Sequence, residues 1–248
     1  MGLFTRKNNA FICANTDFKY GFTLAEVLIT LGIIGVVAAM TIPNLITSHQ
    51  KRVTVTKLQK AISVINQAYK MAYEDVGEAS AEEAMALGGE EYFKNYWAPY
   101  IKVNTYCNEP KDCGYKSHNP FKRLDGNSNS TVRLISKNNR VTFNTMDGFL
   151  YIIMTRSSRI DPDGNHILVS SPYVIVDING GRNPNQYGKD VFFLTRVPDG
   201  KGIQPYGYNF TNELINKYCS KTEKSSNGDT CAEKIKRAGW QIDKSYPW

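Results

Sequence analysis

The sequence is poor in the groups on which enzyme chemistry usually depends. It holds three histidines in 248 residues. His49 follows a long apolar run, His118 and His166 fall in segments predicted to be loops, and no nucleophile motif accompanies any of them. Because acid–base and nucleophilic catalysis need such groups together, we expect a protein that is not an enzyme.

The chain also carries only a small excess of positive charge. The net charge is +7 at pH 7, which is mild for a protein that binds nucleic-acid phosphates. Positive residues gather near the C-terminal end, where they could meet DNA, but a solvated basic face is the simpler interpretation. We therefore do not expect nucleic acid as a partner. The residues are Lys217, Lys221, Lys224, Lys234, Lys236, Arg237 and Lys244.

Cysteines are few, and their spacing disfavours a zinc site. Cys13 lies near the N-terminus, while Cys107, Cys113, Cys219 and Cys231 lie far along the chain. They form no CxxC knuckles and have no histidines beside them. In an oxidising compartment the last four predict two disulfides. Three pairings are possible, and we favour the local ones, Cys107 with Cys113 and Cys219 with Cys231.

Charge is missing altogether between Val27 and Ser48. The apolar run from Val27 to Ile46 is about 20 residues, or roughly 30 Å of helix, and is long enough to cross a bilayer core. Basic residues lie on both sides of it. The modest excess before it predicts that residues 1–21 are cytoplasmic and that the large remainder lies outside the cytoplasm.

One carboxylate, Glu26, stands at the start of this run. A charge in an apolar helix costs roughly 2.5 to 3.5 kcal/mol, so Glu26 is a candidate functional residue. The alternative interpretation of Glu26 is an interfacial residue whose side chain reaches the lipid headgroups. The alternative interpretation of the whole segment is a secretory signal that is cut near Val37-Ala38-Ala39. Glu26 and the helical pattern beyond Met40 both argue against such a signal.

The residues that enter the run resemble the cleavage site of type IV prepilins and type II secretion pseudopilins, in the junction Tyr20-Gly21-Phe22-Thr23-Leu24-Ala25-Glu26. The resemblance implies that a prepilin peptidase cuts after Gly21 and methylates the new amino terminus, Phe22. It implies that Glu26 pairs with the Phe22 amine of a neighbouring subunit, as a buried ion pair that sets axial register. It extends to Pro43, near which the filaments of this family melt locally; an ordinary proline kink is the alternative.

Helical periodicity continues beyond the apolar run to Val76. Apolar residues recur at three-and-four spacing on one face, and polar residues occupy the other. We predict one helix from Thr23 to about Val76, roughly 80 Å long, interrupted at Pro43 and packed along one face on its own domain. The apolar positions are Leu58, Ala61, Ile62, Ile65, Ala68, Tyr69, Ala72, Tyr73 and Val76.

The rest of the chain predicts an antiparallel sheet. Asp147-Gly148 between two apolar runs indicates a hairpin, and residues 161–165 indicate a loop. A long helix laid across such a sheet is an α+β fold, which is also the pilin architecture. Strands are predicted at 132–136, 140–144, 149–155, 173–178 and 191–197, and short helices at 91–101, 212–219 and 231–240.

The segment from Asp177 to Asp190 is rich in oxygen-bearing side chains and glycine. Asp177, Asn179 and Asp190, with backbone carbonyls, could enclose Ca²⁺, and some pseudopilins bind calcium in a C-terminal loop. Their order does not match an EF-hand. The alternative is a turn in which Asp and Asn satisfy their own backbone. No other cofactor is predicted.

These observations predict a cytoplasmic leader at 1–21, a helix at 22–77 that spans the membrane at about 24–46, and an extracytoplasmic pilin-like domain at 78–248. The resemblance implies a single-pass inner-membrane subunit with a periplasmic domain. An inner-membrane assembly platform would extract it into a filament of pilin subunits, as a structural subunit of a type IV pilus or type II secretion pseudopilus. The alternatives are a minor pilin or adhesin that binds DNA, a surface or secretion cargo, and an unprocessed anchored domain.

Overall fold

The computed structural model describes residues 21–127, 133–135, 139–155, 157–160, 166–169, 173–223 and 227–248. The chain divides into two compact units, Met1–Thr47 and Ser48–Trp248. Helix α1, Leu24–Val76, begins in the first unit and ends in the second. Of the predicted leader, the structure describes Gly21 alone, and the loop predicted at 161–165 lies outside the described residues.

In the first unit α1 carries its apolar side chains outward. From Val27 to Ile46 the large apolar residues are between 41 and 71% exposed. Its polar side chains bond back to the helix: the hydroxyls of Thr30 and Thr41 donate to the carbonyls of Glu26 and Val37, at 2.8 and 2.9 Å. Among the described residues, α1 is the one helix long and apolar enough, by length and composition, to cross a membrane.

The interruption predicted at Pro43 is wrong, because α1 is helical without a break through this residue. A proline removes one backbone donor and crowds the preceding turn, yet the helix continues on both sides of it. Beside it, Asn44 Nδ2 lies 3.5 Å from the Met40 carbonyl, and the Thr47 hydroxyl donates to the Pro43 carbonyl at 2.9 Å.

The second unit is built on a six-stranded antiparallel sheet in the order β1-β2-β3-β6-β7-β8. The predicted hairpin joins β2 to β3, with Gly148 at φ 80° in its turn. A separate two-stranded ribbon pairs β4 with β5. The strands are β1 Val103–Tyr106, β2 Arg140–Thr145, β3 Leu150–Met154, β4 Ser157–Ile160, β5 His166–Val169, β6 Tyr173–Asp177, β7 Val191–Val197 and β8 Gly202–Pro205.

Two sequence-based expectations fail in this region. His166 begins strand β5 rather than lying in a loop. The strand predicted at 132–136 is absent from Arg133–Ile135, the part of it that the structure describes. Leu134 instead packs as a fully buried plug, with its N–H bonded to the His118 carbonyl at 2.8 Å. An isolated buried residue in an extended loop has the same local composition as a strand, so pattern alone does not separate them.

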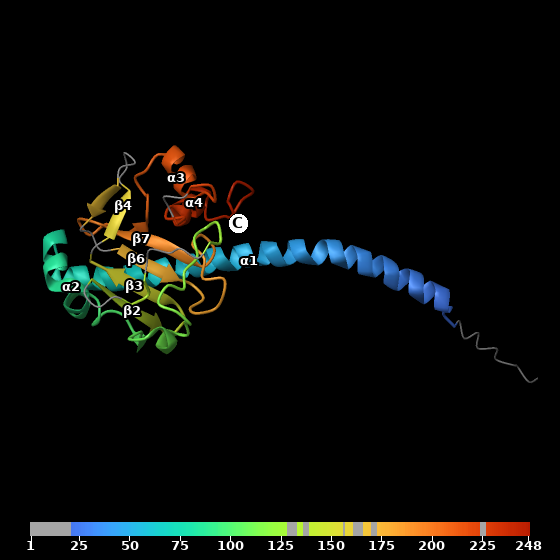
Figure 1. Ribbon diagram of the computed structural model, residues 1–248, viewed down its shortest axis with the longest axis horizontal. Coiled ribbons are helices and arrows are strands. Elements are labelled where there is room, and N and C mark those ends of the chain that lie inside the picture. The colour runs from blue at the N-terminus through green and yellow to red at the C-terminus, as the bar shows by residue number, and fades with distance from the viewer. Residues whose placement is uncertain are drawn as a thin grey trace, which may run out of the picture. The chain divides into compact units, whose positions relative to one another are not determined.

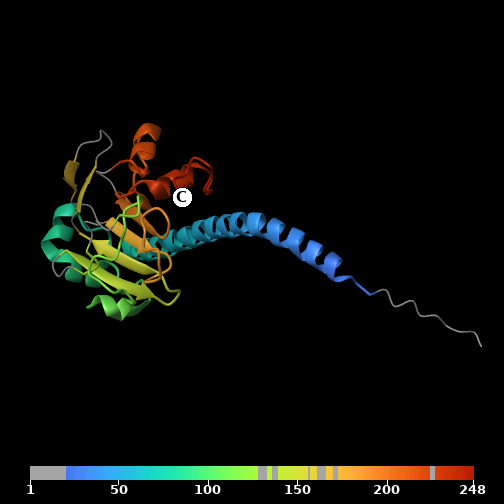
Figure 2. The same ribbon diagram turned by 45° about the vertical axis from the view of Figure 1, so that its right-hand side comes forward.

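The C-terminal part of α1 lies across one face of the sheet (Figures 1 and 2). Leu58, Ala61 and Ile65 are fully buried there, against inward-facing residues of the central strands. The α+β fold is thus confirmed, with the apolar stripe of the helix packed into this core layer. The strand residues in this layer are Phe143, Tyr151, Ile153, Val174, Val176, Phe192, Leu194 and Ile203.

Loops cover the opposite face of the sheet, so the central strands are buried on both sides. The 3₁₀ helix η1, Pro110–Cys113, belongs to this layer, which also holds Tyr115, Phe121 and Tyr187. The disulfide between Cys107 and Cys113 closes the loop that carries η1. This cover explains why β3, β6 as far as Val176 and β7 as far as Leu194 are continuous apolar runs rather than alternating ones.

Helix α2, Ala81–Tyr96, begins ten residues before the helix predicted from the aromatic cluster. Ser80 caps it by accepting from the Glu83 N–H at 3.1 Å, and Gly88, at φ 75°, kinks it. The following Gly89 lies directly against the backbone of Arg140, where a Cβ has no room. The paired glycines thus mark a break between two helical segments, at the non-helical backbone of Gly88, and a close approach to β2 at Gly89.

Two short helices, α3 Asn212–Tyr218 and α4 Cys231–Arg237, lie together on the β7 side of the sheet (Figures 1 and 2). A disulfide between Cys219 and Cys231 joins the end of α3 to the start of α4. Helix α4 ends two residues before Gly239, whose φ is 69°. The Trp240 N–H then bonds to the Ile235 carbonyl at 2.9 Å, the pattern of a Schellman cap.

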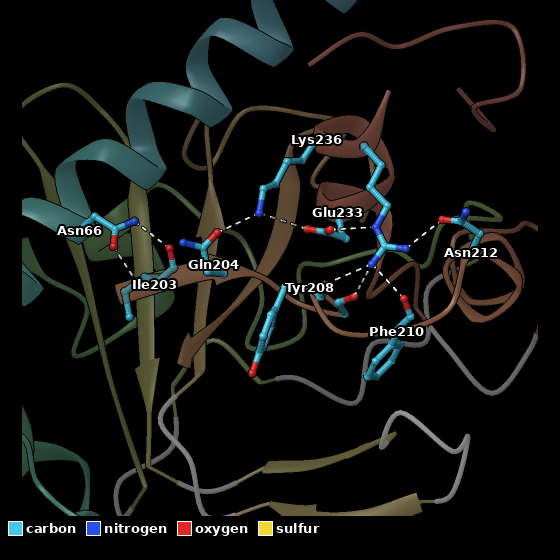
Figure 3. Close-up of polar contacts among 10 residues, drawn as sticks. Asn66, Ile203, Gln204, Tyr208, Phe210, Asn212, Glu233 and Lys236 are labelled. Atoms are coloured by element: carbon cyan, nitrogen blue, oxygen red, sulfur yellow. Dashed lines mark hydrogen bonds and ion pairs between the residues drawn. The ribbon is translucent and has the colours of Figure 1, made fainter. Parts of the chain in front are cut away.

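A polar network ties these helices to the edge of the sheet (Figure 3). The Asn66 side chain pairs with both backbone groups of Ile203 on the edge strand β8, each at 2.7 Å. Lys236 lies between Gln204 and Glu233, at 2.9 and 3.7 Å. Asn66 thus occupies the position that a further strand would take, and so covers the exposed edge of β8.

Arg237 anchors the loop before α3. Its guanidinium donates to the carboxylate of Glu233 at 2.9 Å, to Asn212 at 2.8 Å, and to the carbonyls of Tyr208 and Phe210 at 3.1 and 2.9 Å. The Glu233 side chain is only 4% exposed. Most of the basic residues that the sequence places at this end are therefore structural contacts, as Lys221, Lys234 and Lys236 also donate within the domain.

Replacing Arg237 by Met is expected to lower the free energy of unfolding by about 2 to 4 kcal/mol. The change leaves the buried Glu233 carboxylate with Lys236 alone, at 3.7 Å, and leaves the carbonyls of Tyr208 and Phe210 without their donor. Removing one partner of a buried pair in this way destabilises the fold, because the other partner stays buried without compensation. Urea unfolding of the full chain in detergent, followed by tryptophan fluorescence, measures it. Lys244→Met, at an exposed residue, is the matched control. A loss for Arg237→Met no larger than about 0.5 kcal/mol, the scale of a surface change, would contradict this account.

Candidate processing and assembly segment

The predicted cleavage junction lies in the open, immediately before α1. Gly21 and Phe22 precede the first helical residue, Leu24. Phe22 is 88% exposed, and a Cβ built on Gly21 meets no heavy atom within 4 Å. The bond therefore lies outside the helix and is accessible, as a protease substrate must be.

Thr23 and Glu26 form a capping box at the start of α1. The Glu26 carboxylate accepts from the Thr23 N–H at 2.9 Å and from the Thr23 hydroxyl at 2.8 Å. The hydroxyl in turn accepts from the Glu26 N–H at 3.2 Å. Each residue thus satisfies a free donor of the other at the helix terminus.

The capping box fixes the position of the Glu26 carboxylate. It holds the Glu26 carboxylate within the first turn, where the helix dipole favours negative charge. Among the described residues, Glu26 forms no ion pair. Thr23 was not among the predicted site residues, although its pattern, Thr-x-x-Glu before an apolar run, is the recognised signature of such a cap.

Comparison with protein families divides the chain close to the end of the apolar run. A model described as a prokaryotic N-terminal methylation motif matches residues 18–42. It covers Gly21, Phe22 and Glu26, so this is the prepilin-type cleavage and methylation segment. A second model, described as a family of unknown function (DUF6613), matches residues 44–248.

The chain belongs to the DUF6613 family. No curated protein and no solved structure matches it. The DUF6613 chain thus joins a prepilin-type segment to a domain that no named relative explains. Its long N-terminal helix, packed on an antiparallel sheet, gives a pilin-like architecture. Together these observations make it a type IV pilin-like or pseudopilin-like subunit, anchored by its apolar helix.

The three residues predicted to bind calcium come together in the DUF6613 domain. Asp190 accepts from the backbone of Asn185 at 2.8 Å and of Gln186 at 2.6 Å, and from the Asn179 side chain at 3.0 Å. Asp177 accepts from the Asn179 N–H at 3.1 Å and from the Tyr115 hydroxyl at 2.8 Å.

All four carboxylate oxygens of Asp177 and Asp190 therefore already accept a hydrogen bond. Among the described residues, no three His, Cys, Asp or Glu side chains group as metal ligands do. This arrangement is the turn that the sequence analysis named as its alternative, and a Ca²⁺ would have to replace these donors. Calcium binding at this loop stays a prediction.

Burial sets the electrostatics of this carboxylate pair. Asp177 is fully buried, and its pKa is raised well above the usual range, first by burial and then by the nearby charge of Asp190. Burial also raises the pKa of Asp190 to about 6, against the effect of its hydrogen-bond donors. Tyr115, 62 residues away from Asp177 in sequence, has no local signal that could have identified it.

The stability of the fold is expected to fall as pH rises through the pKa of Asp190. Because the folded chain binds this proton more tightly than the unfolded chain, whose value is near 3.8, the protonated group favours the fold below about pH 4. That contribution is lost by about pH 6, by roughly 3 kcal/mol.

Urea unfolding of the wild type and of Asp190→Asn at pH 4, 5, 6 and 7 checks this expectation. The variant lacks the titrating group, so its stability relative to the wild type should improve steadily between pH 4 and 6 and then level off. A difference that does not change with pH would show that Asp190 titrates alike in both states.

Proposed function

We propose that this chain is a structural subunit of a type IV pilus or a type II secretion pseudopilus. A prepilin peptidase cuts after Gly21 and methylates the amine of Phe22. The carboxylate of Glu26 then pairs with the Phe22 amine of a neighbouring subunit, and this contact sets the register of the filament. The observation that carries the proposal is the N-terminal methylation motif at residues 18–42, joined without a gap to the apolar half of α1.

We also propose the membrane topology of the subunit and its transfer into the filament. Residues 1–21 are a cytoplasmic leader, residues 24–46 cross the inner membrane once within the helix 22–77, and residues 78–248 lie in the periplasm. The exposed apolar side chains of α1 need a dry environment at every stage, since each costs free energy in water. Lipid supplies it before assembly, and the helices of other subunits supply it after an inner-membrane platform extracts the chain.

Mass spectrometry of the N-terminal peptide tests the proposal. The chain is isolated from membranes of cells that contain or lack the prepilin peptidase. A methylated Phe22 terminus is expected only when the peptidase is present. An intact Met1 would instead indicate an unprocessed anchored domain, and a terminus near Ala39 would indicate a secreted one.

Pro43 belongs to the proposed assembly residues. It removes one helix donor in the part of α1 that would melt locally when the subunits pack into a filament.

A further inference from the structure

Within the unit Ser48–Trp248, helix α1 begins basic and ends acidic. The sequence from Ser48 to Tyr73 holds five lysine and arginine residues and no aspartate or glutamate. The sequence from Glu74 to Glu91 holds seven acidic residues and no basic one. The basic residues are Lys51, Arg52, Lys57, Lys60 and Lys70, and the acidic residues are Glu74, Asp75, Glu78, Glu82, Glu83, Glu90 and Glu91. This part of the chain thus carries opposite charge at its two ends.

The acidic end combines the last turn of α1 with the start of α2, which lies beside it in both views (Figures 1 and 2). The hydroxyl of Tyr100, four residues beyond α2, donates to Asp75. Glu74 and Glu82 are exposed and form no ion pair with any described residue. Val76, 49% exposed, adds apolar surface to this end.

The stability of α1 does not account for these acids. Its last turn carries Glu74 and Asp75 and no basic residue. The negative end of the helix dipole lies at this terminus, so carboxylates there destabilise the helix and cations stabilise it. Tyr100 offsets the effect at Asp75 by its hydrogen bond. The carboxylate of Glu74 is therefore unfavourable in the isolated domain, and a cation from outside the domain would relieve it.

The basic end has no acidic partner within its own chain. Arg52 is exposed, Lys57 is half-buried, and neither forms an ion pair with a described residue. Val53, between them in sequence, is 37% exposed. Arg52 and Glu74 lie 22 residues apart on one continuous helix, or about 33 Å, far beyond the Debye length of about 8 Å at physiological salt. Their charges can meet only between two chains.

We propose that the acidic end of one subunit docks on the basic end of a second copy. The two α1 helices would run parallel and be displaced by about 33 Å along their axes. Glu74 and Glu82 of one copy would then face Arg52 and Lys57 of the next. Complementary charge of this kind fixes register and excludes wrong partners. The proposal rests on the filament assembly described under the proposed function, and adds to it a contact between the globular domains.

Zero-length cross-linking of sheared filaments with a carbodiimide tests the proposal, because this reagent joins a lysine amine to a carboxylate in contact with it. Mass spectrometry is expected to find a peptide with Lys57 joined to a peptide with Glu74. The two residues lie 17 positions apart on one helix, or about 26 Å, so such a link must connect two copies. A link from Glu74 to a different protein would overturn the second copy as the occupant.

Charge reversal gives an independent test. Arg52→Glu/Lys57→Glu and Glu74→Lys/Glu82→Lys should each lower the amount of chain in sheared filaments, relative to membranes, about tenfold, because each brings like charges together. The variant with all four substitutions keeps the net charge and restores opposite charges at the contact. It should enter filaments as the wild type does.

Lys111→Glu/Lys116→Glu is the matched control, since it reverses two exposed lysines outside both ends of α1. It should leave incorporation unchanged. An equal loss in this control, or no recovery in the variant with four substitutions, would overturn the proposal. An error in the proposed function appears differently, because the wild-type chain would then lack the methylated Phe22 terminus and be absent from filaments.

Discussion

Replacing Gly21 by Val is expected to abolish maturation and leave the whole chain at its precursor length. The proposed scissile bond, between Gly21 and Phe22, lies within the matched methylation motif, and a branched side chain there would fill the space that the peptidase must reach. The fold itself tolerates the change, since Gly21 has no heavy atom within 4 Å of a built Cβ. Immunoblots of membranes from peptidase-containing cells should show precursor alone, with the methylated Phe22 peptide below detection.

Gly32→Val is the matched control for this experiment. Gly32 also has open space around it, but it lies inside α1 and beyond the cleavage bond. Its variant should be cut as the wild type is, so a loss of maturation there would point to failed membrane insertion. Normal maturation of Gly21→Val would refute cleavage at this bond and move attention to the region of Ala39.

The sequence was a good guide wherever the contacts that decide structure are local or periodic. The three-and-four spacing from Leu58 to Ala72 predicted the helix and the face it buries, because a helix repeats its neighbours along the chain. Short loops likewise favoured the disulfide pairs that join Cys107 to Cys113 and Cys219 to Cys231. The strands β2, β3, β6 and β7 were found within a residue or two of their ends.

The misses have a common physical cause, which is that distant contacts override local pattern. Leu134 was predicted to belong to a strand, but it is a buried loop residue whose N–H donates to the His118 carbonyl. The edge strand β8 has too few residues to show alternation, and the Asn66 amide completes its pairing. The close approach of Gly89 to Arg140 has no local signal either, because the two residues are 51 positions apart in sequence.

The candidate site divides in the same way. Gly21, Phe22 and Glu26 lie within six consecutive residues of the matched methylation motif, so sequence alone could locate them. The buried partner of Asp177, the Tyr115 hydroxyl, could not be located in this way, because it lies 62 residues away in sequence. Tertiary structure alone brings the two together.

Replacing Glu26 by Gln is expected to stop filament incorporation while leaving cleavage intact. Glutamine serves in a capping box as glutamate does, so the hydrogen bonds that hold Thr23 at the start of α1 can persist. Only the charge is lost, which leaves the Phe22 amine of the next subunit uncompensated in apolar surroundings. Breaking a buried pair in this way costs about 3 to 5 kcal/mol, or roughly a hundredfold or more in incorporation. The amount of the chain in sheared filaments, relative to membranes, measures it.

Thr23→Ala separates the charge of Glu26 from its role as a cap. This variant removes the hydroxyl of the cap but keeps the carboxylate, and the loss of an N-cap side chain costs about 1 kcal/mol. Incorporation should therefore fall about fivefold at most. If Thr23→Ala and Glu26→Gln reduced incorporation equally, the carboxylate would matter for starting the helix rather than for binding the neighbouring amine. A large gap between the two variants would place its function between subunits, since within its own subunit the described structure gives Glu26 no cation to pair with.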